Sequence, residues 1–153
     1  MKVLVFNEQS DLPINTETVQ PVVKEALALE NRRTDEIAVY FVSSQEISRL
    51  HKEFFDDPTP TDCISFPMDT GTETGYQMLG EIFVCPKTAL DYVYKSGQEI
   101  NEEIYREVTL YLVHALLHLL GYRDQEPADI KQMREAEKRH LEHFIRKKVL
   151  VSC

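Results

Sequence analysis

The sequence has few cysteines and no long apolar run, and each shortage excludes a class of protein. Its three cysteines are isolated, and no Cys-x-x-Cys pair occurs, so neither a zinc ribbon nor a redox disulfide is indicated. No segment approaches the roughly 20 consecutive apolar residues of a membrane-spanning helix. The apolar stretch at the N-terminus is too short for a secretory signal peptide. We therefore expect a cytoplasmic protein without a membrane partner.

Basic residues are outnumbered, because 17 Lys and Arg face 26 Asp and Glu and give a net charge of −9. This balance argues against nonspecific binding of nucleic acid by the whole surface, and we expect no DNA partner. Residues 131–148 are the exception, with seven basic and three acidic residues. Such a segment is compatible with local contact to RNA or a ribosome, although a solvated helix face is its more common meaning.

Repeats, low-complexity tracts and linkers are also absent, so we expect one domain over residues 1–153. Apolar periodicity predicts strands at residues 1–6, 36–42, 62–68 and 79–84, with five helices between and after them. Residues 43–46 (SSQE) suit a capping box at the start of a helix. Pro86 and Pro127 suit the first turn of a helix, and Gly97 and Asn101 suit a helix end and a cap. Residues 69–77 form a polar loop beside any cleft. These elements predict an α+β or mixed α/β fold.

The last helix, from Pro127, carries apolar residues that we expect to face inward. They are Ile130, Met133, Leu141, Phe144 and Ile145.

The most informative stretch is residues 114–124, HALLHLLGYRD. His114 and His118 are four residues apart, so on a helix their imidazoles lie on one face and can bind one metal ion. Gly121 predicts the end of this helix, because glycine readily adopts the positive φ that often follows a last helical turn. The chain can then return Asp124 as a third ligand. Two His and a carboxylate, with a fourth position left to water, are typical of a catalytic Zn²⁺ site.

The stretch has two other interpretations. A His pair on an apolar helix also occurs as hydrogen-bonded core residues, but the helix stop and the carboxylate that follow favour a metal site. A metallopeptidase would need Glu after the first His as its general base, and Ala115 stands there instead. The stretch therefore favours a metal site without peptidase chemistry.

Three ordered blocks resemble the YbeY family of bacterial metal-dependent endoribonucleases and rRNA maturation factors. The first is the histidine stretch, the second is residues 60–67 (PTDCISFP), and the third is residues 79–82 (LGEI). Their order and spacing fit the family over nearly the whole chain. The resemblance implies a single α+β domain with a four-stranded mixed sheet, helices mainly on one face and the metal helix buried against it. It also implies cleavage of single-stranded RNA, 16S rRNA 3′-end processing, and contact with ribosomal or ribosome-assembly proteins.

The chain departs from the family pattern at two functional positions. The family's third ligand is His, where this chain has Asp124. The family usually has a catalytic Arg five residues before the Pro-Thr-Asp block, where this chain has Phe55. A phenyl ring cannot stabilise phosphate charge, so we expect weak cleavage unless another cation reaches the site. Arg123 is one candidate, although it also fits a surface turn, and a basic residue of the last helix is another.

Two hypotheses remain open. The first is a metal-dependent endoribonuclease, in which Thr61, Asp62 and Ser65 support the cleft rather than react. The second is a ribosome-assembly or RNA-binding factor that keeps the metal site but has little nuclease activity.

Overall fold

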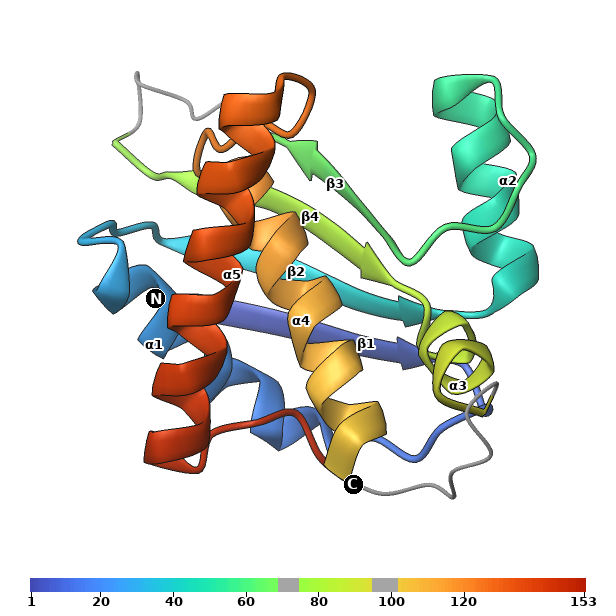
Figure 1. The fold of residues 1–153 in the computed structure, drawn as a ribbon, viewed down its shortest axis with the longest axis horizontal. Coiled ribbons are helices and arrows are strands. Elements are labelled where there is room, and N and C mark those ends of the chain that lie inside the picture. Colours follow the sequence, from blue (N-terminus) through green and yellow to red (C-terminus); the bar gives the residue numbers. More distant parts are fainter. Residues whose placement is uncertain (69–74, 95–101) are drawn as a thin grey trace.

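The computed structural model describes residues 1–68, 75–94 and 102–153, and it has an open sheet with helices around it (Figure 1). The expected cap Asn101, the helix stop Gly97 and most of the loop at residues 69–77 lie outside the described residues. In chain order the elements are β1 (Lys2–Glu8), a 3₁₀ turn (Thr16–Thr18), α1 (Val19–Leu29), β2 (Glu36–Val42), α2 (Ser44–Phe55), β3 (Cys63–Pro67), β4 (Met78–Val84), α3 (Pro86–Tyr94), α4 (Glu102–Leu119) and α5 (Pro127–Lys147).

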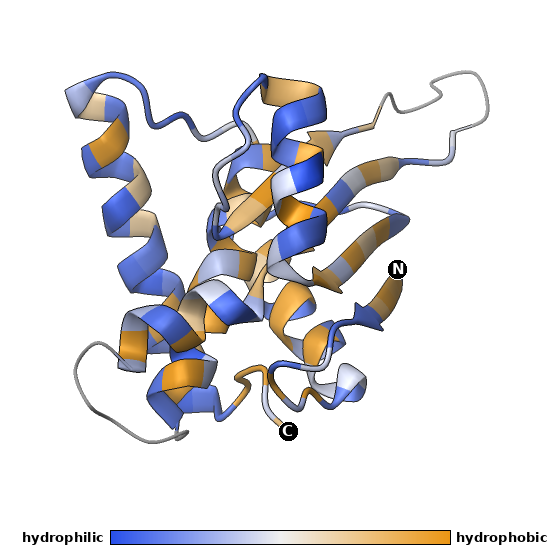
Figure 2. Cartoon of the chain, turned by 90° about the vertical axis from the view of Figure 1, so that its right-hand side faces the viewer, coloured by the Kyte–Doolittle hydropathy of each residue, from blue (hydrophilic) through white to orange (hydrophobic). Residues whose placement is uncertain are grey.

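The sheet has the strand order β1-β2-β4-β3, with β1, β2 and β4 parallel and β3 antiparallel at one edge. The predicted four-stranded mixed sheet is therefore confirmed. Side chains alternate between the two faces of a strand, so Ile37, Val39 and Phe41 of β2 all enter the same core. Figure 2 shows the corresponding mixture of hydrophobic and hydrophilic residues along the strands and helices.

Four helices share one core with one face of the sheet, as the family resemblance implied. The core combines residues of α1, α3, α4 and α5 with those of β2 and β4, and α4 crosses the sheet buried along most of its length. Figure 1 shows α4 and α5 in front of the strands, with α2 standing apart from them. The second, smaller core joins α2 to the other face through Ile47, Leu50 and Ile64. The sheet and α5 thus hold α4, the helix that carries His114 and His118.

Local signals fixed several helix ends. The hydroxyl of Ser43 accepts a hydrogen bond from Glu46 N–H, which is the expected cap of α2, and Pro127 opens α5. The prediction for the inward face of α5 was partly wrong, because Ile130 and Ile145 are exposed. The buried stripe runs instead through Met133, Glu137, His140 and Phe144, which recur at helical spacing. Ile145 lies about 100° further round the helix than Phe144.

In the part of the chain that the structure describes, every helix is too short or too polar to cross a membrane.

Candidate metal centre

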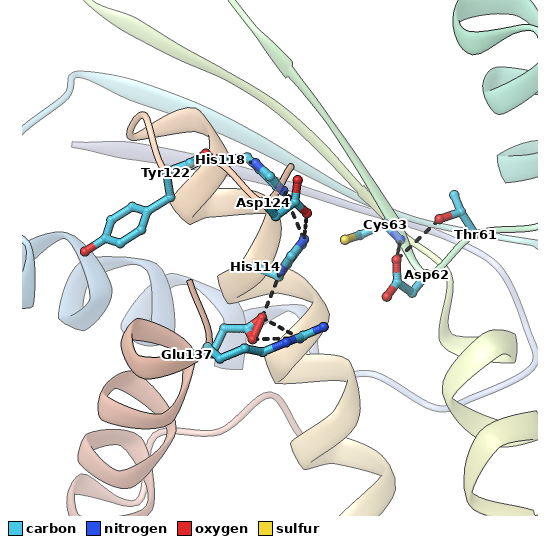
Figure 3. A network of polar contacts seen from close by, with 9 residues as sticks. Thr61, Asp62, Cys63, His114, His118, Tyr122, Asp124 and Glu137 are labelled. Atoms are coloured by element: carbon cyan, nitrogen blue, oxygen red, sulfur yellow. Dashed lines mark hydrogen bonds and ion pairs between the residues drawn. The ribbon is translucent and has the colours of Figure 1, made fainter. Parts of the chain in front are cut away.

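The two histidines of α4 converge as their spacing predicts. His114 and His118 lie one turn apart, and their Nε2 atoms are 3.0 Å from each other (Figure 3). Both rings are half-buried at the edge of the core, so one nitrogen of each remains reachable from outside the helix. Their rings are nearly perpendicular, with an interplanar angle of 82°. Both Nε2 atoms can therefore face one ion.

A tight helix end brings the third candidate ligand back. Gly121 has a φ of +106°, and its N–H donates to the carbonyl of His118 at 3.1 Å. The N–H of Tyr122 donates to the carbonyl of Leu117 at 3.0 Å. These two bonds are the pair that defines a Schellman end, which needs a left-handed residue where Gly121 stands. The chain reverses there and carries Asp124 back toward the histidines.

The returning carboxylate completes a three-ligand group. Oδ2 of Asp124 lies 3.2 Å from Nε2 of His118 and 3.5 Å from Nε2 of His114. The three candidate ligand atoms all lie within 4.8 Å of one another. Two imidazole nitrogens and one carboxylate oxygen at such mutual distances fit the first shell of a divalent metal.

Hydrogen bonds on the other ring nitrogens orient both histidines. Nδ1–H of His114 donates to Oε1 of Glu137 at 2.9 Å, and Nδ1–H of His118 donates to the carbonyl of Tyr122 at 3.0 Å. With the proton on Nδ1, each Nε2 keeps its lone pair for a metal. A carboxylate behind a ligating His also raises its basicity. The chain therefore presents the tautomers that a metal site needs.

Glu137 is almost fully buried, and its partners account for its charge. Burial by itself raises the pKa of Glu137, but the hydrogen bond and charge of His114, together with Arg134, outweigh it and lower that pKa below its usual value. Burial lowers the pKa of His114, but the bond and charge of Glu137 outweigh it and raise that pKa above its usual value. The pair is thus a charge-assisted contact between α4 and α5.

The return loop is tied down on its outer side as well. The hydroxyl of Tyr122 donates to Oε1 of Glu30 at 2.7 Å, and Arg139 and His140 of α5 contact Oε2 of the same carboxylate at 3.0 and 2.9 Å. Because the Tyr122 carbonyl accepts from His118, this cluster fixes a backbone group that orients a candidate ligand. The end of α1 therefore supports the metal centre without touching it.

A cavity of about 890 Å³ opens over the three ligands. It lies between α2, the start of β3, α3, α4 and α5, and Thr61, Asp62 and Ser65 are among the residues that line it. Asp62 Oδ1 accepts from the N–H of Cys63 at 2.7 Å and from the hydroxyl of Thr61 at 3.3 Å. The carbonyl of Thr61 accepts from the hydroxyl of Thr88 at 3.1 Å. These bonds fit the expected supporting role, which stays a prediction.

The two arginines near the site differ in position. Arg123 is exposed and is not among the residues that line the cavity, so its catalytic role stays a prediction. Arg134 of α5 does line the cavity, and its Nη1 lies 3.1 Å from both carboxylate oxygens of Glu137. Phe55 also lines the cavity, from the end of α2. Arg123, the arginine that the sequence suggested, therefore does not line the cavity over the candidate ligands, whereas Arg134 does.

Sequence reasoning missed three residues of this site, Arg134, Glu137 and Glu107. Glu107 lines the cavity from α4, and burial raises its pKa above the usual value. The available signal was the helical spacing of α5, where Glu137 falls on the same stripe as Met133, His140 and Phe144. A charged residue on a buried stripe needs a partner, and that requirement points to a site.

Residues 4–145 match the family model described as Endoribonuclease YbeY. The chain belongs to the YbeY family. A protein of Protochlamydia amoebophila named Endoribonuclease YbeY is 49% identical over 138 residues, which are 90% of this chain and 89% of that protein. The Endoribonuclease YbeY of Chlamydia caviae is 36% identical over 153 residues, covering 99% of this chain and 96% of that protein. The family resemblance expected from the sequence is confirmed.

The fold is also seen in a solved structure. The solution structure of TM1509 from Thermotoga maritima aligns with a TM-score of 0.60 at 23% identity, and covers 92% of this chain and 87% of that one. At this identity the likeness supports the fold alone. The YbeY family consists of metal-dependent nucleases that act in rRNA maturation, and this chain combines that membership with a His-His-Asp group.

Proposed function

We propose that this YbeY-family chain is a metal-dependent endoribonuclease that cleaves single-stranded RNA during rRNA maturation, including 16S rRNA 3′-end processing. The observation that supports it most is the convergence of His114, His118 and Asp124 at the floor of an open cavity. We further propose Zn²⁺ as the ion, since nitrogen and oxygen donors in a set of three are typical of catalytic zinc. RNA in the cytoplasm is the substrate, and ribosomal or ribosome-assembly proteins are the partners.

Each residue has a defined task in this proposal. His114, His118 and Asp124 would hold the ion, which would act as a Lewis acid toward a phosphoryl oxygen. Glu137 and the Tyr122 carbonyl hold the two imidazoles in the ligating tautomer. Thr61, Asp62 and Ser65 keep the opposite wall of the cavity in shape. The 2′-hydroxyl of RNA is itself a nucleophile next to the phosphate, which lessens the demand on a protein base.

Arg134 is the cation that we propose for the phosphate, with Arg123 as the second candidate. Nη1 of Arg134 donates to the carboxylate of Glu137. The N–H groups on Nε and Nη2 form the other edge of the Arg134 guanidinium. A planar fork of this kind suits a phosphate, and charge stabilisation is usually the largest contribution to such a reaction. Arg134 would thereby take over the task that Phe55 cannot perform.

A second candidate function is a ribosome-assembly factor with little nuclease activity. Phe55 and four carboxylates line the cavity, and both features disfavour a transition state with added phosphate charge. The carboxylates are Asp62, Glu107, Asp124 and Glu137.

Cleavage of single-stranded RNA by purified protein tests the proposal. We expect cleavage with Zn²⁺ and its loss with a chelator or in His114→Ala, while single-stranded DNA of the same sequence stays intact. Residual cleavage by His114→Ala, purified in the same way, measures contaminating nuclease. His143→Ala is the matched histidine control and should keep the activity, because His143 pairs with Glu25 and not with the ligand group. Binding of RNA without cleavage under any divalent metal would favour the assembly factor.

A further inference from the structure

Two exposed aromatic rings line the cavity that holds the candidate metal ligands. Phe55, at the end of α2, is 55% exposed, and Tyr92, on α3, is 65% exposed. An aromatic side chain buries a large apolar surface when it is covered, so two uncovered rings beside a reaction site need an explanation. Neither ring contributes to a hydrophobic core of the described chain.

The Phe55 ring has packing partners on one side that favour its observed position. It packs against the imidazole of His51 with a centroid distance of 5.6 Å and runs nearly parallel to Phe66 at 6.3 Å. Nδ1 of His51 contacts the carbonyl of Thr59 at 2.8 Å, and Asp56 ends the helix in the left-handed conformation. A ring positioned in advance loses little conformational freedom when a ligand stacks on it.

The cavity wall is mostly negative, so we expect RNA affinity to depend largely on groups other than the phosphates. Its lining includes four carboxylates, on Asp62, Glu107, Asp124 and Glu137, against one arginine, Arg134. Away from a metal ion, such a wall repels an RNA backbone rather than attracting it. Bases are uncharged and present flat faces, and aromatic rings bind unpaired bases of any sequence by stacking.

We propose that Phe55 and Tyr92 form a base-stacking subsite, which binds unpaired RNA bases on either side of the phosphate held at the metal ligands. The inference rests on the proposed endoribonuclease function and adds the reason for its strand preference. Bases of a duplex are already stacked and paired, so their faces are closed to the two rings. Single-stranded RNA is selected because its bases can turn toward Phe55 and Tyr92.

A fluorescent RNA tests the subsite by binding rather than by cleavage. The probe is a short single-stranded 2′-O-methyl RNA, which lacks the 2′-hydroxyl nucleophile, with one 2-aminopurine whose fluorescence falls when it stacks. Metal-loaded protein is titrated as wild type, Phe55→Leu and Tyr92→Leu, and the probe is recovered to confirm that it is intact. Phe54→Leu and Tyr94→Leu are matched controls, since both residues are exposed neighbours that do not line the cavity.

We expect Phe55→Leu and Tyr92→Leu each to weaken binding about 5- to 150-fold and to reduce the quenching, while the two control variants behave like wild type. Phe55→Trp should retain both signals. An abasic probe of the same length should bind wild type as weakly as the leucine variants do, and should not distinguish the proteins.

Equal affinity and equal quenching for wild type, Phe55→Leu and Tyr92→Leu would overturn the stacking subsite. Metal-dependent cleavage by the same preparations would then still support the proposed function. Conversely, a wild type that never cleaves RNA would overturn the nuclease proposal, while the probe titration would report on the subsite independently.

Discussion

Glu137 is a carboxylate with only 4% of its surface exposed, and its position shows how single residues define this site. A buried charge is costly unless it is paired, and Glu137 is paired on both sides, with His114 and with Arg134. It therefore connects the candidate ligand on α4 to the only arginine among the described residues of the cavity wall. Residues of α5 outside the candidate ligand group can thus affect both metal binding and the phosphate contact that we propose.

The first prediction separates the two candidate cations. We expect Arg134→Gln to lower kcat/KM for RNA cleavage about 100- to 1,000-fold, the usual effect of losing one donor that stabilises charge, or about 2.7–4 kcal/mol. Arg123→Gln should change the rate little, because Arg123 is not in the cavity wall. Metal content is measured in each variant, so that loss of the ion is not mistaken for loss of the cation.

A second-site change sharpens this test. Phe55→Arg introduces a guanidinium into the same cavity from α2. In the Arg134→Gln background it should restore part of the lost kcat, which is measured at saturating RNA because the variant also lacks the Phe55 ring. A large loss in Arg123→Gln with none in Arg134→Gln would reverse the assignment of the two arginines.

The next prediction concerns Asp62, whose Oδ1 accepts from Cys63 N–H and the Thr61 hydroxyl. We expect Asp62→Ala to lower the free energy of unfolding by about 1–2 kcal/mol, the usual cost of leaving a backbone N–H without its side-chain acceptor. Asp62→Asn keeps an oxygen at this position and should lose less. The denaturant midpoint measures both variants. If cleavage disappeared while the midpoint stayed unchanged, Asp62 would have a chemical role and not a supporting one.

At the scale of elements, the end of α4 decides where the third candidate ligand, Asp124, lies. Gly121→Ala forces a Cβ into the positive-φ region and should cost about 1–2 kcal/mol of stability. It should also weaken metal binding, because the Schellman end directs the return of Asp124. Gly75→Ala is a matched control, with a φ of +73° and no atom within 4 Å of its added Cβ.

Titration calorimetry with Zn²⁺ on both glycine variants tests this coupling. Gly75→Ala should lose stability and keep the metal affinity of wild type. Equal metal affinity in Gly121→Ala would show that the turn and the ligand are independent.

The junction of α1 with α5 predicts a pH dependence of stability. Burial lowers the pKa of His140 below its usual 6.5, although its bond to Glu30 opposes that shift. Within the described structure, Nδ1 of His140 is buried without a hydrogen-bond partner, so a proton there would be unsatisfied. The unfolded chain accepts that proton as the pH falls below 6.5, and the folded chain resists it. His140 therefore stabilises the fold above pH 6.5, and this contribution is lost progressively as the pH falls toward its lower folded pKa.

His140→Gln provides the comparison, because glutamine can still donate to Glu30 but does not titrate. We expect the free energy of unfolding of wild type to fall more steeply than that of His140→Gln between pH 7.5 and pH 5.5. Chemical denaturation at each pH, with chelator present, measures this difference. Parallel pH profiles of the free energy of unfolding for the two proteins would show that His140 does not cause the pH dependence.

The parts of the fold that were predictable are those with local causes. The cap at Ser43, the first-turn Pro127 and the alternation along residues 36–42 act within a few residues, and all three hold in the structure. The candidate metal ligands lie within eleven residues, so one helix and one turn suffice to bring them together. The inward positions of Ile130 and Ile145 were wrong because hydrophobicity alone does not say which side of a helix meets the core.

The remaining parts of the site come from packing between distant elements. Phe55, Tyr92 and Arg134 belong to α2, α3 and α5, and no local pattern says that these three helices border one cavity. Glu137 is 23 residues from its partner His114, so only the docking of α5 on α4 brings them together. Sequence reasoning could name the residue types needed, such as a cation from the last helix, but could not select Arg134.

At the scale of the whole molecule, negative charge dominates both the chain and its cavity. The net charge is −9, and four carboxylates line the cavity wall. A divalent cation would offset this repulsion, both between the carboxylates and toward RNA. The metal is then expected to contribute to folding as well as to catalysis, because its ligands come together only in the folded chain.

The last prediction follows from that linkage. Zn²⁺ at 100 times its dissociation constant should stabilise the folded protein by about 2.7 kcal/mol, and a chelator should remove this gain. His114→Ala and Asp124→Ala should each abolish the metal-dependent rise in melting temperature, and His114→Ala should also start lower because Glu137 loses its partner. His143→Ala should keep the full rise, since His143 pairs with Glu25 and not with the ligand group. A rise of the same size in Asp124→Ala would mean that the ion binds through the two histidines without the returning carboxylate. Thermal unfolding of the four proteins, with and without metal, therefore tests whether the turn at Gly121 brings Asp124 back as a ligand.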